Sequence, residues 1–294
     1  MIIDCHVHCT KRKSVSRRSG THYPTADELL DMMDAGGIDM ALIMCGIGCE
    51  CRSQFVTPED VLEICALHPT RLIPSCCIDP RSGANSPDFD FSAFFEFYKN
   101  AGAKSIGELT SCLPWGDPRT RNLLRQAGEW EMPITFHVAP EPVGYYGLID
   151  ELGLPGVEKA LQDFPDTIFF GHSQPFWAHV SGDVTEETWK GYPKGPVTPG
   201  GRLVELFERY ENLYGDLSAG SGHNAISRDE EFGFAFLDKF QDRLMFGTDI
   251  CFPGQELMQC EWFPANLAAG NIAPDVYEKI TWRNIDRALG LGLA

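Results

Sequence analysis

The sequence predicts one (β/α)8 barrel, also called a TIM barrel, as a single domain over residues 1–294. Eight short apolar runs recur at intervals of roughly 30 to 45 residues, which is typical of the strands of this barrel. Longer amphipathic segments separate the runs, and the runs lack polar alternation, as expected of parallel strands buried on both faces. A doubly wound open sheet is the competing fold. It would usually show a glycine-rich phosphate turn after the first strand, where this chain has His6-Val7-His8.

The expected strands are the apolar runs at residues 2–5, 38–44, 71–78, 103–109, 134–138, 167–171, 213–217 and 244–247. Two helices are expected to begin after the N-cap residues Thr25 and Thr57, with Pro58 in a favoured first-turn position. Helical apolar spacing also predicts a final helix that would close the barrel and two earlier helices, at residues 275–289, 117–131 and 201–211. Residues 174–199 are rich in Gly, Pro and Trp and follow the sixth strand, so we expect an active-site loop there.

Composition and charge narrow the class of protein. Hydrophobic residues make up 43% of the chain, which supports a real core. Acidic residues exceed basic ones, 42 against 24, and the net charge of −18 disfavours nucleic acid as the partner. No apolar run reaches the roughly 18 residues of a membrane span, and Met1 leads directly into the first strand, leaving no room for a signal peptide. With eleven cysteines, an odd number that favours reduced thiols, we expect a cytoplasmic protein.

Two features of the sequence have a functional interpretation besides an ordinary one. Cys49-x-Cys51 and Cys76-Cys77 could form a metal or redox site, although no second cysteine pair at zinc-finger spacing follows them. The basic segment at residues 11–18 is either a solvated loop or a rim that attracts an anionic substrate.

Metal-binding side chains recur at the carboxyl ends of the expected strands, where barrel enzymes carry their functional residues. His6 and His8 end the first strand, and side-chain alternation would place both on one face, with Cys5 and Val7 on the other. The others follow the fourth, fifth, sixth and eighth strands: Glu108, His137, His172 and Asp249. Each alone has an ordinary explanation, such as a core histidine, a turn cap or an ion pair. Their joint placement predicts a metal site.

These residues carry a resemblance that covers essentially the whole chain. Asp4-x-His6-x-His8, followed by His137, His172 and Gly247-Thr248-Asp249, resembles the amidohydrolase superfamily of metal-dependent barrel enzymes. The sequence is more closely similar to the amidohydrolase-2 branch, which includes relatives of aminocarboxymuconate semialdehyde decarboxylase. Residues 280–291 are similar to the final helix of that branch. The motifs are specific for the superfamily and its metal, and they say little about the substrate.

The resemblance implies a role for each of these residues. His6, His8, His137 and Asp249 would hold one divalent ion, most often zinc, although manganese and iron suit the same ligand types. Asp249 would also take the proton of the attacking water. His172 would orient the water or polarise the substrate, or bind the second ion if there are two.

Glu108 is similar to the strand-4 glutamate of TatD-type deoxyribonucleases, where that residue is a metal ligand. It is therefore either a ligand here or a residue that supports the ligands or the substrate. A carboxylate between two cations would suit two-metal catalysis. A nuclease activity itself is disfavoured by the negative charge of the chain.

Substrate contacts are expected from loops at the same end of the barrel, where arginines could pair with a carboxylate and tryptophans could form a wall for a planar ring. The candidates are Arg52, Trp115, Arg119, Tyr145, Tyr146, Trp177, His179, His223 and Arg228.

The expected function is metal-dependent hydrolysis of a small, anionic lactone, amide or cyclic ester. Non-oxidative decarboxylation of an unsaturated or aromatic acid is the alternative, because it also needs stabilisation of developing negative charge and the ligands do not discriminate. A catalytically silent barrel that binds or scaffolds a partner is a third hypothesis, disfavoured because no ligand is lost. The partner is expected to be a small molecule, with no nucleic acid and no membrane, and a homo-oligomer is compatible with the sequence.

Overall fold

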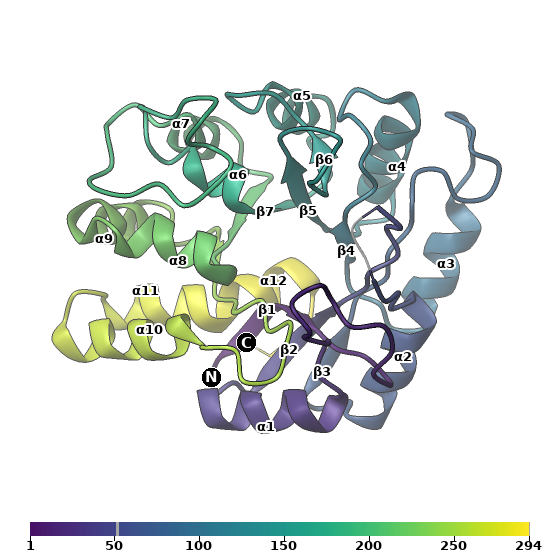
Figure 1. Cartoon of the computed structure of the whole chain (residues 1–294), viewed down its shortest axis with the longest axis horizontal. Helices are drawn as coiled ribbons and strands as arrows, with labels where there is room; N and C mark the ends of the chain where they lie inside the picture. The colour runs from purple at the N-terminus through teal and green to yellow at the C-terminus, as the bar shows by residue number, and fades with distance from the viewer. Residues whose placement is uncertain (51–52, 294) are drawn as a thin grey trace.

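The strands form a closed parallel barrel in the computed structural model, which describes residues 1–50 and 53–293 (Figure 1). Each expected run overlaps one strand: β1 (Ile3–His8), β2 (Met40–Met44), β3 (Leu72–Pro74), β4 (Ile106–Leu109), β5 (Ile134–Ala139), β7 (Phe169–His172), β8 (Leu213–Asp216) and β9 (Leu244–Met245). They pair in parallel in the orders β1-β2-β3 and β4-β5-β7-β8-β9. A bridge between Cys76 and Ile106 joins the two groups on one side, and a bridge between Val7 and Ile250 joins them on the other. The predicted (β/α)8 barrel is confirmed.

Helices surround this barrel, and the first two begin where the capping signals predict. The Thr25 side chain accepts a hydrogen bond from the backbone N–H of Glu28, and the Thr25 backbone N–H donates to the Glu28 carboxylate in return, at the start of α1 (Ala26–Gly36). Thr57 and Asp60 form the same capping box at the start of α2 (Pro58–Leu67). The further outer helices are α3 (Ser92–Asn100), α4 (Pro118–Glu129), α5 (Pro155–Asp163), α7 (Arg202–Arg209), α9 (Glu230–Lys239) and α10 (Met258–Ala269).

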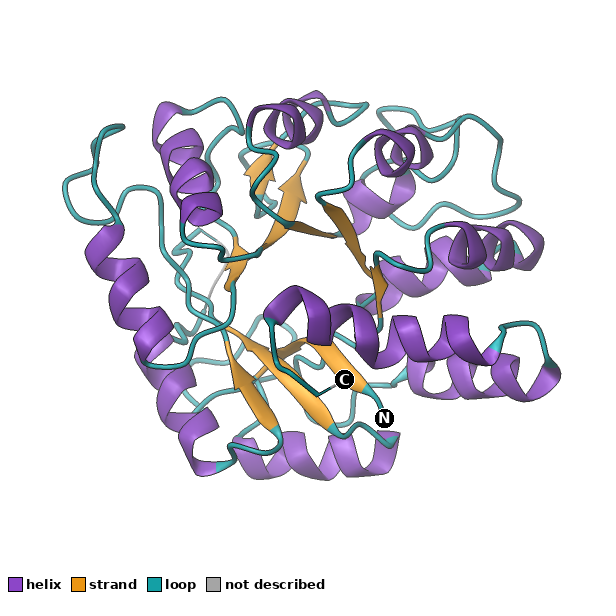
Figure 2. Cartoon of the chain, turned by 180° about the vertical axis from the view of Figure 1, so that it is seen from behind, coloured by secondary structure: helices purple, strands orange, loops and turns teal. Residues whose placement is uncertain are grey.

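The last helix seals the amino-terminal end of the barrel. The expected helix at 275–289 is present as three successive segments: α11 (Pro274–Glu278), the π-helical turn η1 (Lys279–Arg283) and α12 (Asn284–Leu289). Ile285 and Leu289 of α12 join an apolar cluster with side chains of the strands, among them Ile3, Leu42, Ile73, Phe170, Tyr214 and Met245. In Figure 2 this helix, next to the C-terminus, lies across one end of the barrel. The open end is therefore the carboxyl end of the strands.

A β-bulge in β1 changes one expected side-chain orientation. The pairing register between β1 and β2 shifts between Asp4 and Val7. As a result, Cys5 Sγ lies 3.2 Å from Asp216 Oδ1 while His6 Nδ1 lies 2.6 Å from Asp216 Oδ2. The expectation that Cys5 faces away from His6 is wrong, because a bulge interrupts the two-residue alternation of a strand.

The segment at 174–199 is more regular at its start than expected. It opens with α6 (Gln174–Ala178), which begins directly after β7 with Ser173 as N-cap, and only the remainder is irregular. Two elements near the site are among those for which the sequence prediction gives no range. They are β6 (Leu148–Ile149), which pairs with β5, and α8 (Ala219–Ser227), which follows β8 and packs against α6.

Within the described residues, nothing supports the alternative that the cysteine pairs form a metal or redox site. Cys49 is exposed, Cys76 and Cys77 are buried, and all three are free thiols, while Cys51 lies outside the described residues. In the part of the chain that the structure describes, no cysteine belongs to a group of side chains that could hold a metal ion. In the same residues, no helix is both long and apolar enough to cross a membrane.

Candidate metal centre

A buried carboxylate fixes the ring of His6. His6 Nδ1 lies 2.6 Å from Oδ2 of Asp216 at the carboxyl end of β8, and both side chains are buried. Because an ionised carboxylate only accepts hydrogen bonds, Nδ1 carries the donated proton and Nε2 faces the other histidine of the strand. A carboxylate behind the ring in this way is typical of metal-binding histidines, because it sets their tautomer and basicity.

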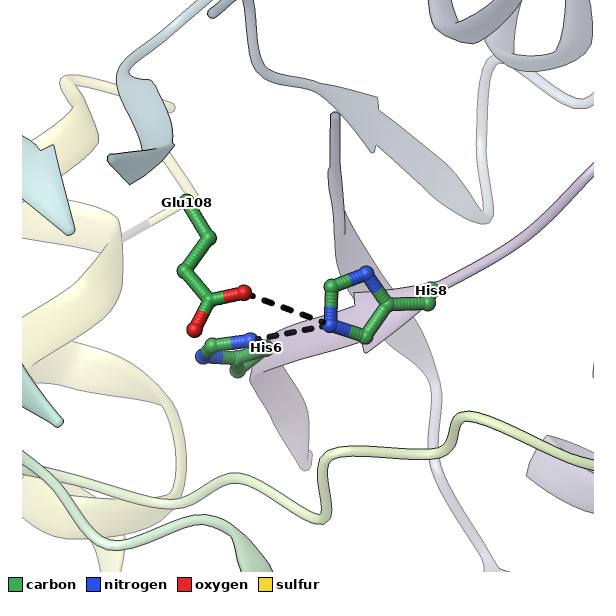
Figure 3. A group of neighbouring side chains, drawn as sticks. All are labelled: His6, His8 and Glu108. Carbon is green, nitrogen blue, oxygen red and sulfur yellow. Dashed lines mark hydrogen bonds and ion pairs between the residues drawn. The ribbon is translucent and has the colours of Figure 1, made fainter. Parts of the chain in front are cut away.

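Four side chains bring their ligand atoms together at the carboxyl end of the barrel: Asp249 and the three drawn in Figure 3, His6, His8 and Glu108. The Nε2 atoms of His6 and His8 are 3.3 Å apart. Asp249 Oδ1 lies 3.8 Å from the first and 3.4 Å from the second, and Glu108 Oε2 lies 3.9 Å from His8 Nε2. Two atoms bound to one tetrahedral zinc ion at about 2.1 Å are about 3.4 Å from each other. The observed separations therefore fit ligand atoms that converge on one ion.

His137 on β5 and His172 on β7 extend the group. His137 Nδ1 lies 3.0 Å from the carbonyl oxygen of Val138. His172 Nδ1 lies 3.0 Å from the Ser218 hydroxyl and 3.3 Å from Asp216 Oδ2. Acceptors beside both Nδ1 atoms place the ring proton there, which leaves each Nε2 available as a ligand or base.

Glu108 connects the two halves of the cluster. Possible ligand atoms of His6, His8 and Glu108 all lie within 4.8 Å of one another, and so do those of Glu108, His137 and His172. Imidazole nitrogen with carboxylate oxygen is a donor set that suits zinc, manganese or iron. The residues present thus fit a divalent ion, and the shared position of Glu108 is compatible with one ion or two.

Asp4 holds the turn that carries Asp249 against β1. Its carboxylate accepts hydrogen bonds from the backbone N–H of His6 at 3.0 Å and of Thr248 at 3.1 Å, and from the Thr248 hydroxyl. Asp249 in turn donates its backbone N–H to the carbonyl oxygen of His6 at 2.9 Å. The Asp249 side chain is 22% exposed, whereas those of His6 and His8 are 6% exposed or less. Asp249 is therefore the cluster member most open to solvent.

The charges of the site set the protonation of its histidines in the metal-free protein. Burial opposes protonation of His6, but the negative charge of Asp216 outweighs it and raises the pKa of His6 to about 9. For His137, burial dominates and lowers the pKa to about 4. Burial alone would raise the pKa of Asp216, yet His6 and His172 hold it well below its usual range. A metal ion that binds His6 would therefore displace a proton from it, and its affinity would depend on pH.

Asp216 is the principal site residue that sequence reasoning did not identify. It ends β8 in the motif Leu-Tyr-Gly-Asp, so it meets the criterion that selected the other residues, namely a metal-type side chain at a strand's carboxyl end. Its carboxylate contacts the rings of His6 and His172 and accepts the backbone N–H of Ser218 at 3.0 Å. One carboxylate therefore orients two imidazoles of the cluster.

Two tyrosine rings lie against histidines of the site. Tyr23 stacks on His8, with ring centroids 5.1 Å apart and ring planes 29° apart, and it is buried. Tyr146, one of the expected substrate contacts, lies 4.1 Å from the ring of His137 and is 38% exposed. The partly exposed ring of Tyr146 suits a planar group of a substrate, whereas Tyr23 is buried against His8.

The two expected tryptophan contacts lie in the hydrophobic core. Trp115 is 3% exposed and packs edge-on against Phe136, with ring centroids 4.9 Å apart. Trp177 is 2% exposed and donates its indole N–H to the backbone carbonyl of Asp216 at 2.9 Å. Because neither ring leaves a face for a substrate, we leave both out of the proposed substrate contacts. Trp177 instead supports the strand end that carries Asp216.

The other expected contacts have varied surroundings. Arg52 lies outside the described residues. Tyr145 is partly exposed, with Lys190 Nζ 6.0 Å from its ring centroid. His223, on α8, packs edge-on against Trp262 at 6.1 Å, and burial lowers its pKa.

Three of the expected contacts have other partners or positions. Arg119 pairs with Asp117 at the start of α4. His179 is bonded at both ring nitrogens, to the carbonyl of Pro175 and the N–H of Gly153, which marks it as a structural histidine. Arg228 is the C-cap residue of α8.

A closed parallel barrel with histidines and carboxylates gathered at its carboxyl end defines the class of metal-dependent barrel enzymes. The chain belongs to the amidohydrolase family, whose model (Amidohydro_2) matches residues 3–291. The resemblance seen in the sequence motifs is confirmed. No curated protein matches the chain.

Solved structures similar to this chain span nearly its full length. One is the 2,6-dihydroxybenzoate decarboxylase from Rhizobium, with 15% identity, a TM-score of 0.61, and coverage of 99% of this chain and 98% of that one. A zinc-bound amidohydrolase from Burkholderia multivorans has 14% identity, a TM-score of 0.61 and coverage of 99% of both chains. A probable 2-pyrone-4,6-dicarboxylic acid hydrolase from Acinetobacter baumannii, with citric acid bound, has 11% identity, a TM-score of 0.55, and coverage of 98% of this chain and 99% of that one. At these identities, the similarity shows a shared fold.

Proposed function

We propose that the protein is a metal-dependent hydrolase that adds water to a small, anionic lactone, amide or cyclic ester. The placement of Asp249 carries this proposal. Its carboxylate lies 3.4 Å from His8 Nε2 and 3.8 Å from His6 Nε2, yet its side chain is 22% exposed. A carboxylate that borders both the ligand atoms and the solvent is well placed to take a proton from an attacking water.

The other residues have complementary roles. His6, His8, His137 and Asp249 would hold the ion, with Glu108 as a further ligand. When bound, a divalent ion such as zinc would lower the pKa of a water molecule towards about 7 and polarise the substrate carbonyl. His172 would orient the water or the substrate, since its Nδ1 is held by Ser218 and Asp216 while its Nε2 is left available.

The comparisons support this proposal at the level of the family. A zinc-bound amidohydrolase and a probable dicarboxylic acid hydrolase share the fold with this chain. A decarboxylase also shares it, so decarboxylation is the competing reaction that an experiment must separate from hydrolysis.

The test combines metal analysis with product analysis. The purified protein, loaded with zinc, manganese or iron, is screened against lactones, amides, cyclic esters and unsaturated or aromatic carboxylic acids. We expect water addition to at least one lactone, amide or ester, and its loss in Asp249→Asn. The matched control is Asp27→Asn, which changes an exposed carboxylate in the first turn of α1.

Two outcomes would refute the proposal. Release of carbon dioxide without water addition would establish the decarboxylase alternative. Stoichiometric metal binding without turnover of any substrate class would instead favour a binding or scaffold protein.

A further inference from the structure

Part of the basic segment at 11–18 is already neutralised by the protein itself. Lys11 Nζ lies 2.6 Å from Glu63 on α2, and Lys13 Nζ lies 2.5 Å from Glu28 on α1. Both acidic partners are on outer helices rather than among the residues of the metal centre. Lys11 and Lys13 therefore have acidic partners, and attraction of an anionic substrate by this segment stays a prediction.

Arg17 has a different position from these lysines. Its guanidinium carbon lies 4.3 Å from the ring centroid of Tyr23, and the guanidinium also interacts with the side chains of Tyr23 and Cys251. Tyr23 stacks on His8, and Cys251 is two residues beyond Asp249. Arg17 therefore lies between the loop after β1 and the turn after β9, close to two members of the metal centre.

A tight turn holds Arg17 in this place. Its backbone N–H donates to Thr21 at 2.9 Å, and its carbonyl accepts from Gly20 at 2.8 Å. Gly20 has a φ of 83°, which glycine adopts without strain. None of the ion pairs within the described residues includes Arg17. The guanidinium is half-buried and bonded to the side chains of Tyr23 and Cys251, but among the residues that the structure describes it has no carboxylate partner. Because it carries five N–H donors, it retains some of them for an anion.

We propose that Arg17 binds a carboxylate of the substrate, a few atoms from the bond that reacts. This inference rests on the proposed hydrolysis and names its substrate class as lactones, amides or esters that carry a carboxylate. The site is lined by the carboxylates of Asp249, Glu108 and Asp216, and the chain has a net charge of −18. An anion that approaches this site needs a local cation, and Arg17 supplies one beside the ring of Tyr23.

The experiment compares Arg17→Gln with Arg18→Gln, which removes the same charge from the neighbouring, exposed position. Kinetics use the best carboxylated substrate from the activity screen and its uncharged methyl ester. A second readout is calorimetric binding of glutarate to the zinc-loaded protein. Arg17→Lys tests whether the planar guanidinium, rather than charge alone, is needed.

We expect Arg17→Gln to lower kcat/KM for the carboxylated substrate by about 10- to 100-fold, mainly through KM, as for a lost hydrogen bond to a charged group. The methyl ester should change by less than about twofold, because its contact with Arg17 is absent from the start. Glutarate binding should weaken in parallel, Arg17→Lys should recover part of the loss, and Arg18→Gln should behave as the wild type.

Equal losses on both substrates would overturn the inference, because they would show a general structural effect of Arg17. Unchanged kinetics, or no glutarate binding by the wild type, would overturn it as well. If glutarate binding depends on Arg17 while no lactone, amide or ester reacts, the proposed hydrolysis fails and the carboxylate site stands. If the protein hydrolyses substrates without preference for carboxylated ones, the proposed hydrolysis stands and the carboxylate site fails.

Discussion

Replacing Asp216 by Asn keeps the size of the side chain. In no orientation, however, can the amide make all the hydrogen bonds that the carboxylate accepts. Oδ2 faces the Nδ1 atoms of His6 at 2.6 Å and His172 at 3.3 Å. On the other side, Oδ1 accepts from the backbone N–H of Ser218 at 3.0 Å and from the Cys5 thiol at 3.2 Å. An amide carries its NH2 on one side only, and on either side that NH2 meets at least one N–H donor.

The expected loss of zinc affinity follows from these unsatisfied hydrogen bonds. A buried donor that loses its partner costs about 1–3 kcal/mol, and more where the partner was charged. Loss of a group that supports a metal-binding histidine typically lowers metal affinity or activity by about 10- to 100-fold. We therefore expect Asp216→Asn to weaken zinc binding by about that factor, which corresponds to about 1.4–2.7 kcal/mol.

Competition with a chromogenic chelator would measure the zinc affinity, and circular dichroism of the metal-free variant would verify that it folds. Ser218→Ala is the matched control, because it removes a hydroxyl contact from His172 but keeps the contact of Asp216 with His6. It should bind zinc within about threefold of the wild type, since His172 is not assigned to the primary ion. Wild-type zinc affinity in a folded Asp216→Asn protein would refute the role given to Asp216.

Further predictions concern the other side chains of the site and the barrel around them. His172→Asn should lower kcat strongly while most of the metal stays bound; complete metal loss by elemental analysis would make His172 a primary ligand. Glu108→Gln should lower metal content or affinity by at least about tenfold if Glu108 is a ligand, and unchanged content would place it outside the ligand set. Gly171→Ala should lower the urea midpoint, because its Cβ would lie 2.1 Å from Phe176 and overpacking costs about 1–3 kcal/mol; an unchanged midpoint would mean that the ring moves aside. Metal removal by a chelator should lower Tm and added zinc should restore it, whereas an unchanged Tm would argue against a site that binds zinc tightly in the folded state.

The strands and the residues of the metal centre could be predicted from the sequence for one physical reason. A parallel barrel buries every strand, so each strand appears as an apolar run, and a polar side chain at its carboxyl end identifies a candidate functional residue. Asp216 gives the same signal and was recoverable from it.

Features that depend on contacts between distant segments were not predictable in this way. The bulge that turns Cys5 towards Asp216 depends on how β1 pairs with its neighbours. The burial of Trp115 and Trp177 depends on packing against residues far away in the chain, such as Phe136 and Asp216. The position of Arg17 over Tyr23 depends on a turn rather than on hydrophobic periodicity.

The bridge between Val7 and Ile250 joins two segments that are synthesised far apart in time. The segment that covers the free edge of β1, together with Asp249, lies far along the chain from it, at Ile250 against Val7, so it leaves the ribosome well after β1. At about 5–20 residues per second, the interval is on the order of ten to fifty seconds. During this time, the edge of β1 is open to pairing with other chains, a hazard that chaperones limit. Unlike a zinc finger, in which nearby ligands gather the metal as they fold, this barrel must assemble almost completely before the ion has a site.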